Sequence, residues 1–127
     1  MAKAAGTGNS RSVTRVVLGV VVLAAAGTFV FLQMQKRRLI EAENRAIALQ
    51  NEEQYEQAIA AYEVLLPRLR GEADQRIRRS LATCYANLAD APGLPFDDAM
   101  ALYRKAYSYS PEAVTNPAIL RRLTGDE

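Results

Sequence analysis

The longest feature of the hydropathy pattern is an uncharged segment near the N-terminus. Residues 16–35 contain no Asp, Glu, Lys or Arg and consist mostly of Val, Leu, Ala and Phe. At about 1.5 Å of rise per residue, a helix of this length would be about 30 Å long, which matches the hydrocarbon thickness of a bilayer. Arg15 precedes the segment and Lys36 follows it, where lipid headgroups would lie. We predict a transmembrane helix with basic flanks over residues 13–38.

A cleaved signal peptide is the alternative that this segment leaves open. Ala24, Ala25 and Ala26 resemble the small residues of a cleavage site that follows a short apolar run. Residues 28–32 stay apolar beyond that point, which is typical of an uncleaved anchor. We favour the anchor, and a mature chain that begins at Gly27 would contradict this choice.

The sequence on either side of the span bears on orientation. Residues 1–12 are small, polar and basic, and they predict a disordered tail. The cations near the span are nearly balanced, with Lys3, Arg11 and Arg15 before it and Lys36, Arg37, Arg38 and Arg45 after it. The α-amino group adds to the first side, so we favour an N-terminus inside. We expect a single-pass protein of a bacterial inner membrane, with residues 39–127 outside the cytoplasm.

From Leu39 the pattern becomes amphipathic. Leu39, Ala42, Ala46 and Leu49 recur at helical spacing, with Ile47 beside them. No Gly or Pro occurs between residues 28 and 66. We therefore predict that the span continues without a break into an amphipathic helix, which ends near residue 51.

Further helices follow, each with apolar residues at helical spacing. The second is expected over residues 55–70, where Pro67 is a potential early end and Gly71 marks the stop. A third is expected over residues 74–88 and a fourth from residue 96, after a loop with two prolines. Ser110 before Pro111 predicts another helix start, and Asn116 before Pro117 predicts a short terminal helix over residues 118–123. This last helix would cap the open face of the fourth.

A repeat relates the second helix to the fourth. Three pairs of positions, each separated by 41 residues, carry the same type of side chain, either aromatic or small. These pairs are Tyr55 with Phe96, Ala58 with Ala99 and Tyr62 with Tyr103. A shared offset of small and aromatic positions is typical of repeated helical hairpins.

These positions resemble the tetratricopeptide repeat (TPR) pattern. The second unit matches at Leu81, Ala82, Tyr85, Ala99, Tyr103, Ala106 and Pro111, and the first in part at Ala42, Ala46, Leu49, Tyr55, Ala58, Tyr62 and Leu65. The match covers residues 41–111. Arg45 and Arg78 depart from it, and residues 90–95 lengthen a turn. The implied fold is all-α, with the transmembrane helix continuing into a two-repeat TPR-like hairpin array over residues 39–127 and a short cap helix.

The resemblance also implies a function. TPR proteins are adaptors that hold a peptide or helix of another protein on the face made by the first helix of each hairpin. Mapped onto this sequence, the groove-facing residues are Glu43, Ile47, Gln50, Arg76, Arg79, Thr83 and Asn87. The two arginines could hold a carboxylate or an acidic segment. The alternative is a solvated helix face in which Arg76 and Arg79 pair with the nearby Glu72 and Asp74.

Composition and charge narrow the choice of function. The chain has no His and a single Cys, Cys84, which predicts small core filler and offers no metal-ligand spacing. Residues 1–40 hold six of the 16 Lys and Arg residues and none of the 14 Asp and Glu residues. Residues 39–127 therefore carry the acidic excess, which argues against nucleic acid as a partner. The acidic doublets, at residues 52–53 and 97–98, fall at helix starts, where they suit the helix dipole.

We therefore expect no catalytic residue, no metal, no cofactor and no small-molecule substrate. The expected partners are other proteins and the lipid bilayer. The leading prediction is a membrane-anchored scaffold that recruits or stabilises other proteins. The alternative is a structural accessory subunit of a larger membrane complex, held by its transmembrane helix, where Gly19 and Ala26 would permit close helix contact.

Overall fold

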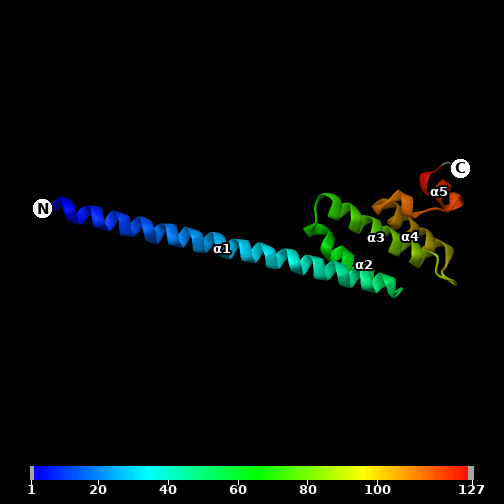
Figure 1. The fold of residues 1–127 in the computed structure, drawn as a ribbon. Coiled ribbons are helices and arrows are strands. Elements are labelled where there is room, and N and C mark those ends of the chain that lie inside the picture. Colours follow the sequence, from blue (N-terminus) through cyan, green and yellow to red (C-terminus); the bar gives the residue numbers. More distant parts are fainter. Residues whose placement is uncertain (1, 126–127) are drawn as a thin grey trace. The chain divides into compact units, whose positions relative to one another are not determined.

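The computed structural model describes the backbone of residues 2–125 and the side chains of residues 10–125, and in this part of the chain helices are joined by short turns and loops (Figure 1). In order, the elements are α1 (Ala2–Asn51), α2 (Tyr55–Leu65), the 3-10 turn η1 (Leu66–Arg68), α3 (Gly71–Ala89), α4 (Phe96–Tyr109), the 3-10 turn η2 (Pro111–Ala113) and α5 (Pro117–Thr124). The all-α class predicted from periodicity is confirmed. The chain divides into two compact units, Met1–Arg38 and Leu39–Glu127.

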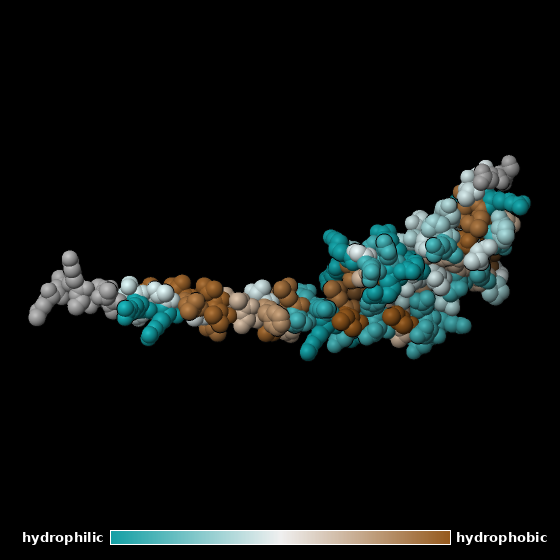
Figure 2. Space-filling model, turned by 45° about the horizontal axis from the view of Figure 1, so that its top comes forward, coloured by the Kyte–Doolittle hydropathy of each residue, from teal (hydrophilic) through white to brown (hydrophobic). Residues whose placement is uncertain are grey.

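The first unit is a helix whose apolar side chains all face outward. Every described side chain from residue 10 to residue 38 is exposed, and Figure 2 shows apolar residues gathered along this helix. Thr14 and Thr28 donate their hydroxyls to the carbonyls of Ser10 and Ala24, at 2.7 and 2.8 Å. Since the helix also satisfies its own backbone groups, these two threonine hydroxyls do not need water as a partner.

One helix in the described residues, Ser10–Asn51, is long and apolar enough to cross a membrane. A continuous apolar surface of this size is unfavourable in water and marks a membrane or protein contact. This finding fits a single membrane span and also a signal anchor. α1 includes residues 2–12, for which the sequence predicts a disordered tail. The side chains of residues 1–9 lie outside the described residues, and the tail stays a prediction.

The second unit begins with residues 39–51 of α1 and ends after α5. α2 packs on α3, α3 packs on α4, and α4 contacts both η2 and α5. Ala46, Ala58 and Ala82 are fully buried, and Ala99 is half-buried. Their small side chains let these helices approach closely. Cys84 is also fully buried, in the core among Ile77, Leu81 and Tyr85.

The boundary between α2 and α3 differs from the prediction. α2 ends at Leu65 instead of near residue 70, because Pro67 has no N–H to donate and its ring clashes with the preceding turn. α3 then starts at Gly71, three residues earlier than expected, and Gly71 adopts a positive φ of 61° that favours glycine. The Arg70 guanidinium donates to the carbonyls of Pro67 and Leu69 and satisfies this turn.

The two predicted caps near the C-terminus have different outcomes. Asn116 caps α5 as expected, since its Oδ1 accepts a hydrogen bond of 2.9 Å from the backbone N of Ala118. Ser110 precedes a helix start as expected, since η2 begins at Pro111, but η2 is only a short 3-10 turn and the Ser110 side chain makes no capping hydrogen bond. Ser110 is instead buried beneath that turn.

Three tyrosines link α2, α3 and α4 each to the helix before it. Tyr62 on α2 donates its hydroxyl to Gln50 Oε1 on α1 at 2.7 Å, and Tyr85 on α3 donates to Glu63 Oε1 on α2 at 2.6 Å. Tyr103 on α4 donates to Asp90 Oδ1, directly after α3. We call Tyr62, Tyr85 and Tyr103 the interhelical tyrosines. Each combines an aromatic ring in or against the core with one specific polar contact, so the three together fix the order of packing.

The surroundings of these tyrosines disfavour the phenolate. Burial raises the pKa of Tyr62 above its ordinary value. Burial and the hydrogen bond to the Glu63 carboxylate raise the pKa of Tyr85 still further. Burial and the hydrogen bond to Asp90 raise the pKa of Tyr103 to about 12. An unfolded tyrosine releases its proton near pH 10, so the folded unit binds more protons than the unfolded chain above that pH.

The first prediction concerns alkaline pH. Below about pH 10, titration of these tyrosines should not change the free energy of unfolding of residues 39–127. Between about pH 10 and about pH 12, the free energy of unfolding should fall as pH rises. Tyr103→Phe should make this fall shallower. Near-UV circular dichroism during denaturant titration of the full chain reports this unit specifically, because all six tyrosines follow residue 50 and there is no Trp. Tyr107→Phe is the control, and equal slopes in both variants would contradict the account.

The second prediction concerns close helix packing. Ala46→Leu should lower the free energy of unfolding by about 1–3 kcal/mol, because the added carbons have no space in a fully packed contact. Ala48→Leu, two residues away on an exposed position of the same helix, should change it by less than about 0.5 kcal/mol. A similar cost for both substitutions would show that residue 46 is not a close contact.

Candidate functional site

The seven predicted groove residues all reach the surface of the second unit. Ile47, Arg76, Arg79 and Thr83 are exposed, while Glu43, Gln50 and Asn87 are half-buried. Three lie on residues 39–51 of α1 and four on α3. An ion pair between Glu43 and Arg76 shows that these two segments adjoin. We call this set of seven residues the α1–α3 face.

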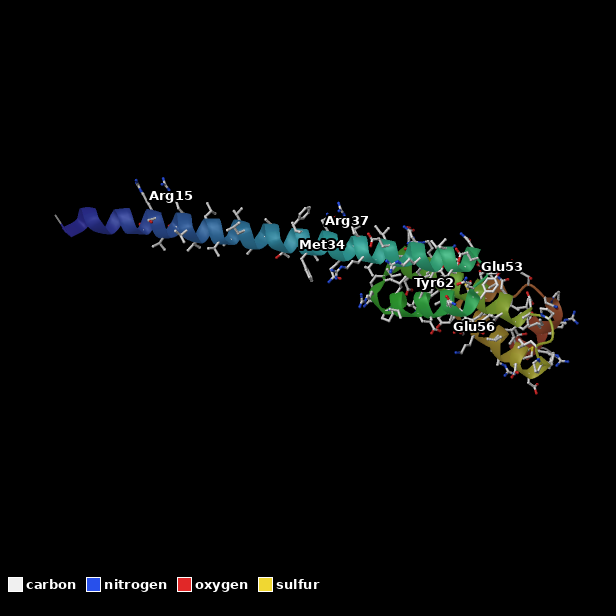
Figure 3. The ribbon with its side chains drawn as sticks, turned by 90° about the horizontal axis from the view of Figure 1, so that it is seen from below. Arg15, Met34, Arg37, Glu53, Glu56 and Tyr62 are labelled. Carbon is white, nitrogen blue, oxygen red and sulfur yellow. The ribbon has the colours of Figure 1, made fainter. Side chains whose placement is uncertain are left out.

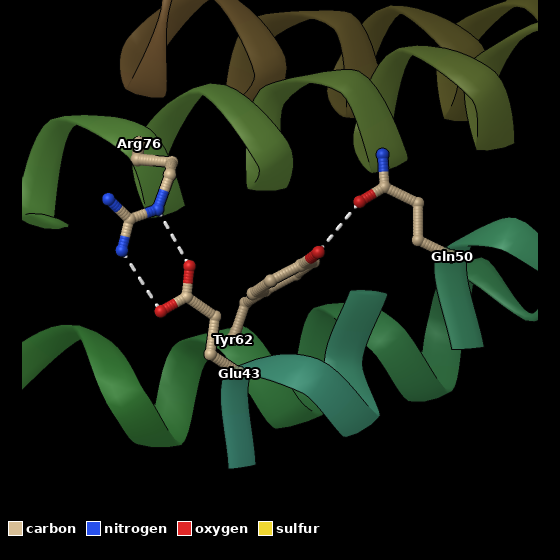
Figure 4. Close-up of polar contacts among 4 residues, drawn as sticks. All are labelled: Glu43, Gln50, Tyr62 and Arg76. Atoms are coloured by element: carbon tan, nitrogen blue, oxygen red, sulfur yellow. Dashed lines mark hydrogen bonds and ion pairs between the residues drawn. The ribbon is translucent and has the colours of Figure 1, made fainter. Parts of the chain in front are cut away.

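The centre of the α1–α3 face is a two-pronged ion pair (Figure 4). Arg76 Nε lies 2.7 Å from Glu43 Oε1, and Arg76 Nη2 lies 3.0 Å from Glu43 Oε2. The hydrogen bond and charge of Glu43 raise the pKa of Arg76. Parallel contacts of this kind fix the geometry of both side chains. Arg76 therefore already has a counter-ion on its own chain.

The alternative pairing with Glu72 and Asp74 is not what the structure contains. Arg76 pairs with Glu43 across two helices, and Asp74 pairs instead with Arg78, whose Nε lies 3.0 Å from Asp74 Oδ2 on the next turn of α3. The partner of Arg76 is 33 residues away in the sequence.

Other polar side chains of the face also have hydrogen-bond partners within the chain. Gln50 Oε1 accepts the Tyr62 hydroxyl, and Figure 4 shows Tyr62 between Gln50 and the ion pair. The Thr83 hydroxyl donates to the Arg79 carbonyl on its own helix at 3.0 Å. Ile47 keeps 39% of its surface exposed. The face thus presents an apolar side chain beside polar groups that are already oriented, which suits a contact surface for a polypeptide.

Arg79 differs from Arg76 because it lies toward α4. Among the described residues its side chain has no hydrogen bond or ion pair. It lines a hollow of about 300 Å³ whose wall consists of Gln75, Arg78, Arg79, Tyr109, Ser110, Pro111 and Glu112. This hollow could not be predicted from the sequence, because it forms where the chain turns through η2 instead of continuing as a helix. Arg79 is the member of the face that is available to an acidic group.

Aromatic and cationic groups meet at two places along α4, one toward its C-terminal end and one at its N-terminus. The rings of Tyr85 and Tyr109 stack with centroids 5.9 Å apart, and Lys105 Nζ lies 5.4 Å from the Tyr85 centroid. Arg122 lies 4.8 Å from the Phe96 centroid, beside another hollow. Such contacts rigidify the surface from which a partner would be recognised.

The resolved pKa shifts of the unit all lie in the same direction. Each shift that is resolved among the described residues moves a pKa away from neutral pH, in the three interhelical tyrosines, in Arg76 and in Cys84, where burial raises it to about 11. Within residues 10–125 no group of three His, Cys, Asp or Glu side chains is placed to hold a metal.

Comparison with protein-family models, with characterised proteins and with solved structures finds no match for this chain. The resemblance to TPR proteins therefore rests on the residues quoted above.

The third prediction tests the ion pair as a structural contact. In a double-mutant cycle of Glu43→Gln and Arg76→Gln, the double variant should be about as stable as either single one, because removing one partner already removes the contact. The coupling should weaken when salt is raised from about 0.1 M to about 1 M. Additive effects of the two substitutions would contradict a direct pair.

Proposed function

We propose that this chain is a membrane-anchored scaffold of TPR type, which recruits or stabilises other proteins at the membrane. In this proposal residues 13–38 span the bilayer of a bacterial inner membrane, and residues 39–127 lie outside the cytoplasm as the binding unit. The exposed apolar helix supports the anchor. The buried alanines and the interhelical tyrosines support a pair of hairpins, since they fall on positions that match the TPR pattern.

The observation that carries the binding proposal is that the two arginines of the α1–α3 face differ, since one has an ion-pair partner and the other has none in the described part of the chain. Glu43 and Arg76 neutralise each other, while Arg79 is left without a counter-ion at the edge of a hollow. Ile47 adds an exposed apolar contact. A polypeptide with an acidic group beside an apolar side chain would satisfy both, and a desolvated guanidinium–carboxylate contact would orient it. Nucleic acid and small-molecule substrates are not part of this proposal.

The second candidate is a structural accessory subunit held by its transmembrane helix. The observation that favours it is the span itself, whose side chains are exposed all round. A Cβ added at Gly19 would meet no atom within 4 Å, so another helix could approach closely there. In this case the span would bind the neighbouring subunits and the helical unit would only cover them.

The fourth prediction separates the two functions by photo-cross-linking in native membranes. The full chain carries one photoreactive residue at position 47, 83, 19 or 64. A scaffold should give adducts from positions 47 and 83, and an accessory subunit should give them from position 19 alone. Val64, which is 69% exposed on α2, is the control outside both surfaces. Adducts at position 64 alone would contradict both candidates.

Charge variants then test the role of Arg79. Arg79→Ala should reduce adduct yield from position 83 about tenfold, because a charge-assisted hydrogen bond contributes about 1.5–3 kcal/mol. Glu43→Gln should increase the yield, since it frees Arg76 for the same acidic partner. Arg121→Ala on α5 is the matched control for loss of one positive charge. No change with Arg79→Ala would remove Arg79 from the binding face.

A further inference from the structure

A further hollow, separate from those of the helical unit, lies on the first unit at the end of the uncharged segment. Its wall consists of Phe29, Val30, Gln33, Met34 and Arg37, and its volume is about 270 Å³. These residues are spaced so that they share one side of the helix. Figure 3 labels Met34 and Arg37 on α1. The hollow therefore combines the last apolar residues of the span with the first cations after it.

The hollow is divided into an apolar part and a polar part. Phe29, Val30 and Met34 are 63%, 55% and 52% exposed and form the apolar part. The Gln33 amide and the Arg37 guanidinium form the polar part, and neither side chain has a hydrogen bond or ion pair among the described residues. The first acidic residue in the sequence is Glu41. The first unit itself thus contains no anion that could neutralise Arg37.

The arrangement of the two parts restricts what could fill the hollow. From Val30 to Arg37 the helix rises about 10 Å, so the occupant must carry an anionic group at one end and apolar chain at the other. We propose that this face binds one anionic phospholipid, whose phosphodiester contacts Arg37 and Gln33 and whose acyl chain lies along Phe29, Val30 and Met34. This inference rests on the proposed membrane anchor and adds a specific lipid contact to it.

The neighbouring cations distinguish a site from general attraction. Lys36 and Arg38 are each turned about 100° from Arg37 around the helix, and neither lines the hollow. They would attract anionic headgroups without selecting one position. A free phosphate ion would meet only the polar part, whereas a phospholipid would meet both parts.

The test uses the full chain reconstituted in vesicles of equal phosphatidylcholine and phosphatidylglycerol, followed by native mass spectrometry of the retained lipids. The wild-type chain should retain phosphatidylglycerol in preference to phosphatidylcholine. Arg37→Gln should lower that preference about fivefold, as expected for loss of one juxtamembrane charge. Arg38→Gln, which removes the same charge beside the hollow, should lower it much less. Equal losses in both variants, or no preference in the wild type, would overturn the site.

Two further arms identify the source of the contact. Phe29→Ser should reduce retention of phosphatidylglycerol while flotation with the vesicles stays intact; unchanged retention would overturn the acyl-chain contact. Inorganic phosphate at millimolar concentration should not displace the lipid, and displacement would show that the face recognises phosphate alone. A wild-type chain that does not float with vesicles would overturn both the anchor and the lipid site, whereas a chain that floats without lipid preference would overturn the lipid site only.

Discussion

The helical unit depends on the interhelical tyrosines, because each one joins two helices through both its ring and its hydroxyl. Tyr62, Tyr85 and Tyr103 place their rings in or against the core and donate to acceptors on the preceding helix or directly after it. Two hairpins alone bury a small core, so specific contacts of this kind decide which packing is adopted. Because Gln50 lies on α1, the same contacts also include residues 39–51 in the unit. The α1–α3 face exists only as a result of that inclusion.

The first unit is governed by a different constraint. Its apolar side chains are exposed and need apolar surroundings, while its polar groups need hydrogen-bond partners within the helix. Its threonines return their hydroxyls to their own backbone, and its charges are confined to the flanks. All charges of residues 1–40 are positive. In the proposed membrane span, hydrocarbon would cover the apolar side chains and anionic headgroups would neutralise the cations.

Local features of this fold could be predicted from the sequence, whereas contacts between distant helices could not. Periodicity indicated the amphipathic helices, the end of α1 at Asn51 and the buried positions of Ala46, Ala58 and Ala82. It also placed the seven face residues on the correct helices. It could not show that Arg76 would pair with Glu43, because that pairing depends on the register of two helices 33 residues apart. The hollow beside Arg79 depends on the path of η2, and a Ser-Pro pair does not fix how long the following helix becomes. The early end of α2 had a visible cause in Pro67, whose effect depends on whether neighbouring helices compensate for the lost hydrogen bond.

The most direct test of the whole account is hydrogen–deuterium exchange of the full chain in lipid nanodiscs, resolved along the sequence. An apolar helix in hydrocarbon that carries a tyrosine-linked helical unit predicts slow exchange in two blocks, residues 16–35 and the helices α2 to α4. Exchange should be fast in residues 90–95, which join α3 to α4, and at the C-terminus. A lone helix in water would be only marginally stable. Exchange of residues 16–35 as fast as that of residues 90–95 would contradict the account.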